Sequence, residues 1–293
     1  SFLPVGLDIP WNLFDGGFYK YEEWLDSLAD NGATYAKIIM APWSFGIEWN
    51  NTGLGNYTNR LDIAFWIDWV LNKAAEEGIY LQICPLIHNE VSTLSNNDWQ
   101  HSPYNAANGG PCENTWDFYS NTQAKSYYKR KLRYINSRWG YSSHIIAWEL
   151  FTETDNTGDW NGHRDEINTW MLETGQYLRN IDPNDHLIST SYAFFEHDED
   201  IWNNSLIDFT QMHIYHKTPE LATRLHSFTQ IYSDAYNKQS LIGEFGLGHD
   251  PSEIAVWDPD GIAFHNSLWA TSLSGSMGSA MAWHWDSYIE SQN

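Results

Sequence analysis

Basic residues, cysteine and long apolar runs are scarce in this chain of 293 residues. The sequence has 15 Lys and Arg against 38 Asp and Glu, a formal net charge of −23. Such a chain repels a nucleic acid or another polyanion, so we expect neither as a partner. No segment approaches the roughly 20 apolar residues that a membrane-spanning helix needs, so we expect no membrane partner.

The two cysteines are Cys84, inside an apolar run, and Cys112, in a loop with Gly and Pro. One disulfide is possible but not required, and no spacing typical of metal ligands occurs. We therefore expect no metal and no other cofactor. An acidic, tryptophan-rich chain with few cysteines suits a secreted or periplasmic protein, and we expect it to be a monomer.

Aromatic residues are abundant, with 17 Trp and 17 Tyr. Flat aromatic rings fill protein cores and also stack on sugar rings. Most of these rings are expected to pack the interior. The others could line a site for a neutral ligand such as a glycan.

Apolar strand-like segments alternate with amphipathic helical segments along the whole chain. Parallel strands joined by helices need right-handed crossovers, and eight of them close naturally into a barrel. The sequence thus predicts an α/β fold, a (β/α)8 barrel in one domain over residues 1–293 that lacks its last outer helix. The predicted strands are Phe2–Ile9, Thr34–Met40, Ile79–Ile87, Ile145–Ala147, Leu187–Ser191, Leu206–Tyr215, Ser240–Gly246 and Gly278–Trp283.

Polar and aromatic residues follow most of the predicted strands, where the sites of such barrels form. Glu153 follows the fourth strand and Glu244 lies on the seventh. Two carboxyl groups, one as general acid and one as nucleophile or base, are what glycoside cleavage requires. The other candidates at strand ends are Trp11, Trp43, His88, Glu90, His213, Tyr215, Trp283 and Trp285.

A retaining mechanism requires the two carboxyl groups to lie about 5–5.5 Å apart, and at that separation they should influence each other's ionisation. If one glutamate is ionised, its charge raises the pKa of the other, so we expect the acid to stay protonated near neutral pH. Tyr215, on the strand beside Glu244, is placed to donate a hydrogen bond to the nucleophile.

These motifs resemble the glycoside hydrolases of clan A, most closely family five, which contains cellulases and mannanases. Trp148-Glu149-Leu150-Phe151-Thr152-Glu153 is similar to the family's motif after strand four, which implies that Glu153 is the acid/base. Gly243-Glu244-Phe245-Gly246 is similar to the motif of the nucleophile. His213-Ile214-Tyr215, His88 and Trp283 match further family positions, and the resemblance implies that Trp283 is a sugar platform. It leaves Glu149 in a supporting role.

Two residues differ from the family pattern. Thr152 stands where the family has an asparagine that bonds the sugar, and a hydroxyl offers one donor where an amide offers two. Lys37 stands where the family has an arginine, and lysine cannot form the same bidentate contact. Both differences bear on which sugar is bound.

The leading hypothesis is a retaining glycosidase that cleaves a neutral β-mannan or β-glucan internally, with Trp11, Trp43, Trp283 and Trp285 stacking on sugars and Glu90 contacting the substrate. One alternative is an exo-acting β-mannosidase or β-galactosidase, in which the long loop Val91–Asn121 closes one end of the cleft. Another alternative is a barrel that binds carbohydrate without catalysis. It is suggested by Thr152 and Lys37, the two residues that differ from the family pattern.

Overall fold

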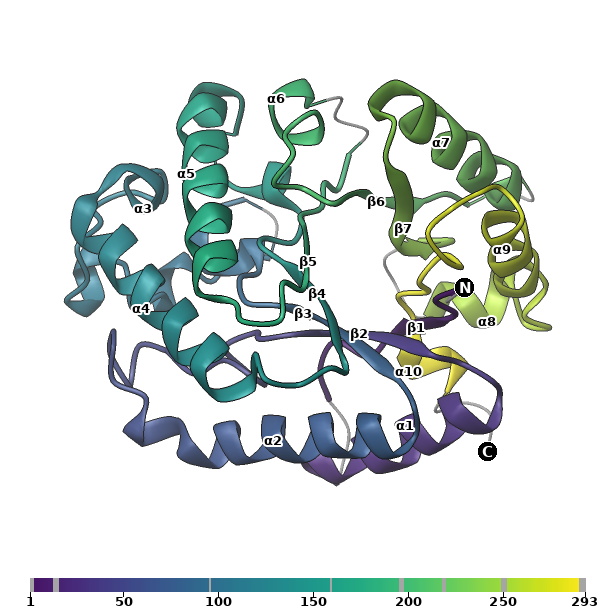
Figure 1. Cartoon of the computed structure of the whole chain (residues 1–293), viewed down its shortest axis with the longest axis horizontal. Coiled ribbons are helices and arrows are strands. Elements are labelled where there is room, and N and C mark those ends of the chain that lie inside the picture. The colour runs from purple at the N-terminus through teal and green to yellow at the C-terminus, as the bar shows by residue number, and fades with distance from the viewer. Residues whose placement is uncertain are drawn as a thin grey trace.

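The strands form a parallel barrel with the helices outside it (Figure 1). The structure, a computed structural model, describes residues 3–12, 16–94, 96–158, 160–194, 198–217, 220–248 and 252–289. Phe2, where the first predicted strand begins, lies outside these ranges. The strands are β1 Gly6–Asp8, β2 Tyr35–Ile39, β3 Tyr80–Cys84, β4 Ile145–Glu149, β5 Leu187–Ser189, β6 Phe209–Tyr215 and β7 Gln239–Gly246.

Single-residue bridges close the barrel. Strands β1 to β5 form one parallel sheet and β6 pairs with β7. Tyr192 bridges to Met212 of β6, and Ala282 bridges both to Phe245 of β7 and to Leu7 of β1. The predicted eighth strand therefore occupies its expected place, but only Ala282 pairs. The segment still bonds to its neighbours, since Met281 N donates to Ile242 O and Trp283 N donates to Phe245 O, both at 3.0 Å.

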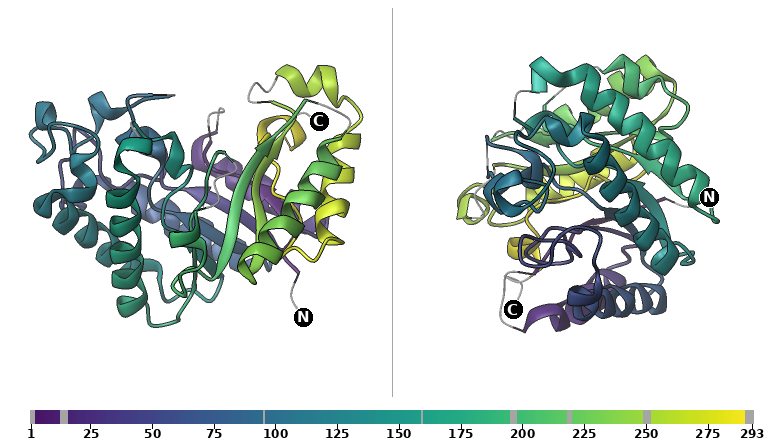
Figure 2. Two further views of the ribbon diagram at one scale, coloured as in Figure 1. Left: turned by 90° about the horizontal axis from the view of Figure 1, so that it is seen from above. Right: turned by 90° about the vertical axis from the view of Figure 1, so that its left-hand side faces the viewer.

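In the part of the chain that the structure describes, six long helices surround the strands. Neighbours along the chain pack side by side, as α1 with α2, α4 with α5 and α7 with α9 (Figure 2). Among the described residues, a four-residue helix, α10, is all that follows Ala282 in place of an eighth outer helix. The long helices are α1 Lys20–Asp30, α2 Leu61–Glu76, α4 Thr122–Trp139, α5 Trp160–Ile181, α7 Leu221–Tyr236 and α9 Ile262–Ser272; the shorter ones are α3 Asp117–Ser120, α6 Glu199–Trp202, α8 Ser252–Trp257 and α10 Trp285–Tyr288.

Helix α4 shows how sequence pattern produces this packing. The Asn121 side chain caps its start by accepting bonds from the amides of Gln123 and Ala124. Its buried residues recur every three or four positions, which lines up one apolar face against the barrel. They include Ala124, Tyr128, Leu132, Ile135 and Trp139.

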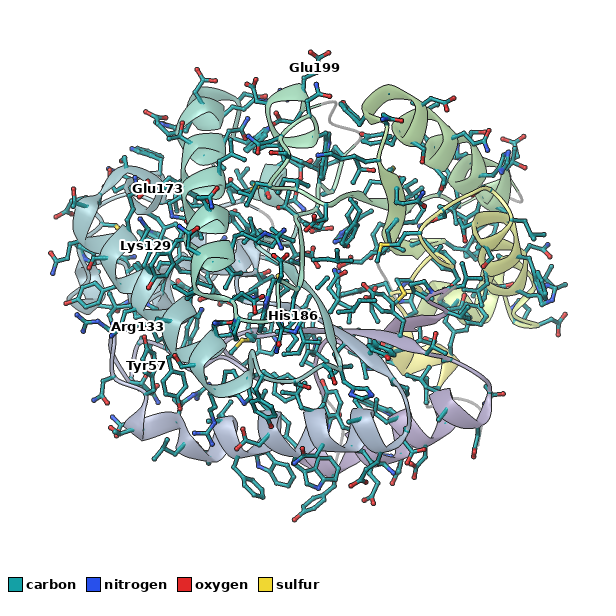
Figure 3. The ribbon with its side chains drawn as sticks, viewed as in Figure 1. Tyr57, Lys129, Arg133, Glu173, His186 and Glu199 are labelled. Atoms are coloured by element: carbon teal, nitrogen blue, oxygen red, sulfur yellow. The ribbon has the colours of Figure 1, made fainter. Side chains whose placement is uncertain are left out.

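The outer face of α4 is charged. Lys129 lies 2.5 Å from Glu173 of α5, and Figure 3 shows the two side chains facing each other between the helices. Both side chains keep substantial solvent contact, so this ion pair contributes little to stability.

The predicted long loop over residues 91–121 holds short helical turns, Trp99–His101 and Ala106–Asn108, before α3. Its Tyr104 and Phe118 are buried and meet edge to face at 4.7 Å between ring centroids. Cys84 and Cys112 are both buried and free, so they do not form the disulfide that the sequence allowed. In the ranges described, no helix combines the length and apolarity needed to cross a membrane.

Gly6 supplies a test of how closely β1 approaches β2. A Cβ at Gly6 would lie 1.7 Å from the Tyr35 carbonyl oxygen, and only backbone movement could relieve that contact. We expect Gly6→Ala to reduce the free energy of unfolding by about 3 kcal/mol or more. The matched control is Gly78→Ala, where φ is +70° but no atom lies within 4 Å, and about 1–2 kcal/mol is expected. Equal losses in urea unfolding would contradict the prediction.

Candidate active site

Glu153 lies just after β4 in a left-handed backbone conformation, with φ of 54°. Such a conformation costs a residue other than glycine about 1–2 kcal/mol. Ser191, just after β5, offsets this cost from both sides: its Oγ accepts a bond from the Glu153 amide at 3.1 Å, and its carbonyl accepts one from Thr154 N at 3.1 Å. Strain of this kind clusters at functional sites.

Two polar side chains form hydrogen bonds with the Glu153 carboxylate, and a third lies near it. Asn156 Nδ2 donates to its Oε2 at 2.8 Å and His213 Nδ1 contacts its Oε1 at 2.9 Å. His88 Nδ1 lies 3.4 Å from Oε2. Burial lowers the pKa of His88, so this ring is neutral near pH 7.

Glu244, on β7, is more deeply buried and has its own set of partners. Lys37 Nζ donates to its Oε1 at 2.9 Å and the Tyr215 hydroxyl donates to its Oε2 at 2.9 Å. The tyrosine contact predicted from the sequence is thus present in the structure. His213 Nδ1 lies 3.1 Å from the same Oε2.

An extra residue in β7 aims Glu244 into the barrel. Met212 of β6 pairs with Ile242, but the next residue, His213, pairs with Glu244. Gly243 is therefore an unpaired bulge residue, and bulges of this kind redirect side chains beside active sites. A Cβ at Gly243 would lie 2.5 Å from Cγ of Gln211, so a glycine fits here best.

His213 brings the two glutamates together, because its Nδ1 contacts both. One ligand-type atom from each of Glu153, His213 and Glu244 lies within 4.8 Å of the others. This spacing could also hold a metal ion, but direct contacts between the histidine and both carboxylates already account for it.

The electrostatics differ from the sequence-based expectation. Burial would lower the pKa of His213, but the Glu244 charge and hydrogen bonds to both glutamates raise it to about 10. Burial would raise the pKa of Glu244, but the charges of His213 and Lys37 and their hydrogen bonds lower it.

The pKa of Glu153 is lowered, as is that of Glu244. Burial and the Glu244 charge would raise its pKa, but the hydrogen bond from His213 and the charge of His213 lower it. The expectation of a protonated Glu153 was wrong, because a cationic histidine lies between the two carboxylates. The proton lies on His213, 2.9 Å from Glu153 Oε1.

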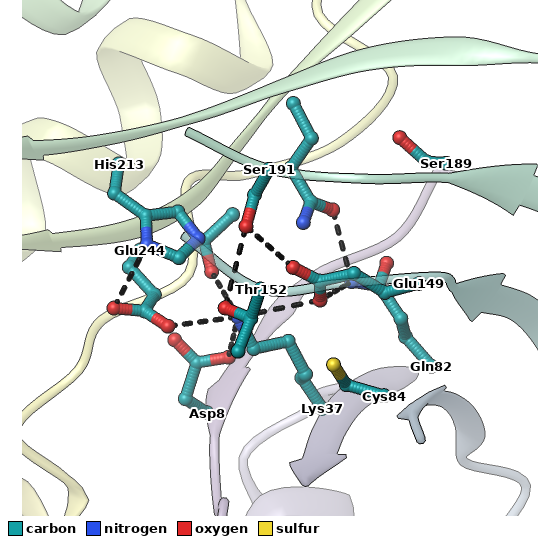
Figure 4. Close-up of polar contacts among 12 residues, drawn as sticks. Asp8, Lys37, Gln82, Cys84, Glu149, Thr152, Ser189, Ser191, His213 and Glu244 are labelled. Carbon is teal, nitrogen blue, oxygen red and sulfur yellow. Dashed lines mark hydrogen bonds and ion pairs between the residues drawn. The ribbon is translucent and has the colours of Figure 1, made fainter. Parts of the chain in front are cut away.

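Beneath Glu244 lies a buried polar network, drawn in Figure 4. Lys37 Nζ lies 3.5 Å from Glu149 Oε2 and 3.9 Å from Asp8 Oδ1, in addition to its contact with Glu244. Glu149 also accepts bonds from Ser191 Oγ and Gln82 Nε2, both at 2.6 Å. Glu149 therefore has the supporting position predicted for it, and Lys37 contacts the carboxylate expected to be the nucleophile.

The sequence reasoning missed Asp8 and Ser191, which belong to this network, and Asn156, which bonds Glu153. Asp8 ends β1, and Ser191 closes the predicted fifth strand. Their positions as polar residues at strand ends were the available signal. Thr152 is buried, with its hydroxyl 3.3 Å from Ser191 Oγ.

Among the predicted aromatic walls, Trp11 is the central ring. It meets Trp43 at 5.2 Å and Trp283 at 5.3 Å between centroids, in both cases edge to face. Trp11 and Trp283 are half-buried, and Trp43 is 39% exposed, so these three present ring surface to solvent. Trp285 is 4% exposed and packs against Trp283, which suits a supporting ring rather than a sugar platform.

Glu90 lies apart from the two glutamates. It is 2% exposed, and its Oε2 lies 4.0 Å from Lys131 Nζ of α4. Burial raises its pKa to about 7, although the Lys131 charge opposes this. A carboxyl buried against α4 has almost no surface for the substrate contact predicted from the sequence.

Comparison with solved structures confirms the barrel fold. The endo-1,4-β-mannanase of Rhizomucor miehei superposes with a TM-score of 0.69 at 16% identity, over 96% of this chain and 86% of that one. A glycoside hydrolase family 5 mannosidase of the same organism superposes with a TM-score of 0.66 at 14% identity, over 97% and 81% of the two chains.

Curated proteins related to this chain in sequence are also mannan-degrading enzymes, although no family model matches the chain. Mannan endo-1,4-β-mannosidase F of Aspergillus fumigatus is 24% identical over 89% of this chain and 63% of its own length. Mannan endo-1,4-β-mannosidase 5 of Solanum lycopersicum is 24% identical over 90% of this chain and 72% of its own length. A probable mannan endo-1,4-β-mannosidase F of Neosartorya fischeri is matched over 44% of its length, so this chain spans less than two thirds of both fungal relatives.

A (β/α)8 barrel with one glutamate after its fourth strand and one on its seventh resembles the glycoside hydrolases of clan A. The chain is similar to mannan endo-1,4-β-mannosidases in sequence and to family 5 enzymes in fold, so the resemblance inferred from the motifs is confirmed.

Replacing Lys37 by methionine tests the buried network. The change leaves the carboxyl groups of Asp8, Glu149 and Glu244 without their shared cation, and removing one partner of a buried ion pair costs about 3–5 kcal/mol. The matched control is Lys129→Met, which breaks the partly exposed pair with Glu173 and should cost less than about 1 kcal/mol. Urea unfolding at neutral pH checks this. Similar losses in the two variants would show that Lys37 does not balance buried charge.

The pH dependence of stability tests His213. Its pKa is about 10 in the folded protein against 6.5 ordinarily, so the folded state holds its proton more tightly. The resulting stability is fully present below pH 6.5 and is lost as pH rises through about 10. We expect His213→Gln to flatten that alkaline decline in urea unfolding, and the exposed His226→Gln to leave it unchanged. A decline of wild-type steepness in His213→Gln would contradict the assignment.

Proposed function

We propose that this chain is a retaining glycoside hydrolase that cleaves the β-1,4-linked backbone of a mannan internally. Glu244 is the nucleophile and Glu153 is the acid/base. The observation that carries the proposal is the pairing of these carboxylates, with one oxygen of each within 4.8 Å of the other. Retaining glycosidases hold their carboxyl groups about 5–5.5 Å apart, whereas inverting enzymes need about 6.5–9.5 Å to admit a water molecule.

The contacts of Glu244 suit a nucleophile. Lys37, Tyr215 and His213 keep its carboxylate ionised and fix both oxygens. The carboxylate attacks the anomeric carbon as the bond to the leaving oxygen breaks, and a covalent glycosyl-enzyme forms.

Glu153 must carry a proton when the leaving group departs. The hydrogen bond to His213 Nδ1 offers a direct source, because that nitrogen holds a proton 2.9 Å from Glu153 Oε1. Transfer to Glu153 arms the general acid and leaves His213 neutral. After the leaving group has gone, Glu153 acts as the base that activates water, which releases the sugar from Glu244.

A neutral polysaccharide fits the site and the charge of the chain. The net charge of −23 disfavours polyanionic glycans, and Trp11, Trp43 and Trp283 offer partly exposed rings for stacking. Among neutral β-glycans, mannan is favoured because the named curated relatives are mannan endo-1,4-β-mannosidases. Such a polymer does not enter cells intact, which supports a secreted or periplasmic location. The protein is proposed to act as a monomer.

An exo-acting β-mannosidase is the second candidate. One structural neighbour is described as a family 5 mannosidase, and the long loop over residues 91–121 contacts the site through Ser92, whose hydroxyl donates a hydrogen bond to the carbonyl of Asn156 at 2.8 Å. The products discriminate between the two modes. Internal cleavage lowers mannan viscosity quickly and yields oligosaccharides, whereas exo action releases mannose with little change in viscosity.

The decisive experiment assays wild type, Glu153→Gln and Glu244→Gln on β-mannan, glucomannan, β-glucan, xylan and aryl β-glycosides. Loss of the general acid should reduce mannan hydrolysis by about 10²- to 10⁴-fold. Glu153→Gln should keep the first step on aryl glycosides with reactive leaving groups, because these need no protonation, while Glu244→Gln should lose both reactions. Glu173→Gln, on the outer face of α5, is the control and should behave as wild type.

Product stereochemistry tests the retaining mechanism. NMR spectra recorded during the first turnovers should show the β-anomer before mutarotation. An initial α-anomer would contradict double displacement. Binding of mannan oligosaccharides without hydrolysis of any substrate would favour a carbohydrate-binding barrel instead.

A further inference from the structure

Asp8 is a buried carboxyl group to which no role has been assigned so far. It ends β1, pairs in register with Lys37 of β2, and is fully buried. Neither of its carboxyl oxygens has a hydrogen-bond partner within the described part of the chain. Its nearest cationic group is Lys37 Nζ, 3.9 Å from Oδ1, and Figure 4 shows both side chains beneath Glu244.

The three carboxyl groups around Lys37 are not equivalent. Glu244 has Tyr215 and His213 as further partners, and Glu149 has Ser191 and Gln82. Asp8 has only the distant ammonium. An ionised carboxylate without donors is costly to bury, and a buried group in this position takes up a proton instead.

The charges that surround Asp8 also favour its protonated form. Burial raises the pKa of Asp8 well above its usual value, and the charges of Glu244 on β7 and Glu149 on β4 raise it further. The charges of Lys37 on β2 and His213 on β6 act against this but do not cancel it. Tyr35 and Tyr215 also face the carboxyl group, and burial raises the pKa of each phenol, so both stay neutral.

We propose that Asp8 is a positioning residue for Glu244 that acts through Lys37: protonated, it leaves the ammonium to the nucleophile, and ionised, it draws the ammonium away. The inference rests on the proposed role of Glu244. In the protonated state Lys37 Nζ stays 2.9 Å from Glu244 Oε1. Loss of the Asp8 proton creates a third full charge around one cation, so the contact that fixes the attacking carboxylate weakens.

Lysine at position 37 makes such sharing possible. Its ammonium is a compact charge with three donors on a flexible stem, so it can shift between neighbouring carboxyl groups. An arginine would offer a rigid planar fork suited to one bidentate partner. The Lys37 departure from the family pattern and the buried Asp8 therefore belong to one arrangement.

The test compares the pH dependence of kcat/KM for wild type, Asp8→Asn and Glu48→Gln on one substrate. Asparagine keeps the shape of the protonated aspartate but cannot ionise. We expect the activity of Asp8→Asn, taken relative to its own value at neutral pH, to persist about one pH unit or more further into the alkaline range than that of wild type. Glu48→Gln removes another buried carboxyl, one whose pKa burial also raises but which lies near Lys131, and should leave the profile unchanged.

Two results would overturn the inference: an Asp8→Asn profile with the wild-type alkaline limb, or an equal loss of activity at every pH. Failure of the proposed function looks different, because wild type would then hydrolyse no glycan. Infrared spectroscopy covers that case without turnover. The protonated-carboxyl absorption of wild type at neutral pH should lose one component in Asp8→Asn and keep that component in Glu48→Gln. Absence of any band that depends on Asp8 would also overturn the inference.

Discussion

Two buried cations hold the site together. Lys37 and His213 each contact Glu244, and His213 also contacts Glu153, so two positive charges serve a group of four buried acids. Without them, carboxyl groups at this depth would take up protons and lose their fixed geometry, because burying an unpaired charge is costly. The parallel barrel makes the arrangement possible, since it brings Asp8, Lys37, Glu149, His213 and Glu244 to one end from five different strands.

The fold and the two glutamates, Glu153 and Glu244, could be predicted from the sequence because each leaves a local signal. Alternating strand and helix patterns reveal a barrel, and a glutamate at a strand end is visible as a short motif. The eighth strand was harder to predict, because only Ala282 pairs in it, and it pairs with β1 and β7 rather than with a segment near it in the chain. The Gly243 bulge was also invisible, since register depends on the facing strand and not on the local sequence.

Charge state was the part of the site that pattern could not predict. Two neighbouring glutamates suggest that each disfavours the other's ionisation. That reasoning fails here because His213 Nδ1 lies within 3.1 Å of both carboxylates. A shared cation lowers the pKa of each carboxyl group instead of leaving one raised. The sequence showed that His213 and Glu244 lie on neighbouring strands, but only the coordinates show one nitrogen facing two acids.

The proton on His213 and the proton on Asp8 therefore have complementary effects on the nucleophile. One adds a positive charge beside Glu244, and the other removes a negative charge below it. Both keep Glu244 ionised, although it is almost completely buried. A nucleophile needs this combination, because an ionised carboxylate with little hydration attacks readily once its geometry is fixed. The departures at position 37 and the unpartnered acid at position 8 are consistent with one electrostatic arrangement rather than with the loss of a catalytic site.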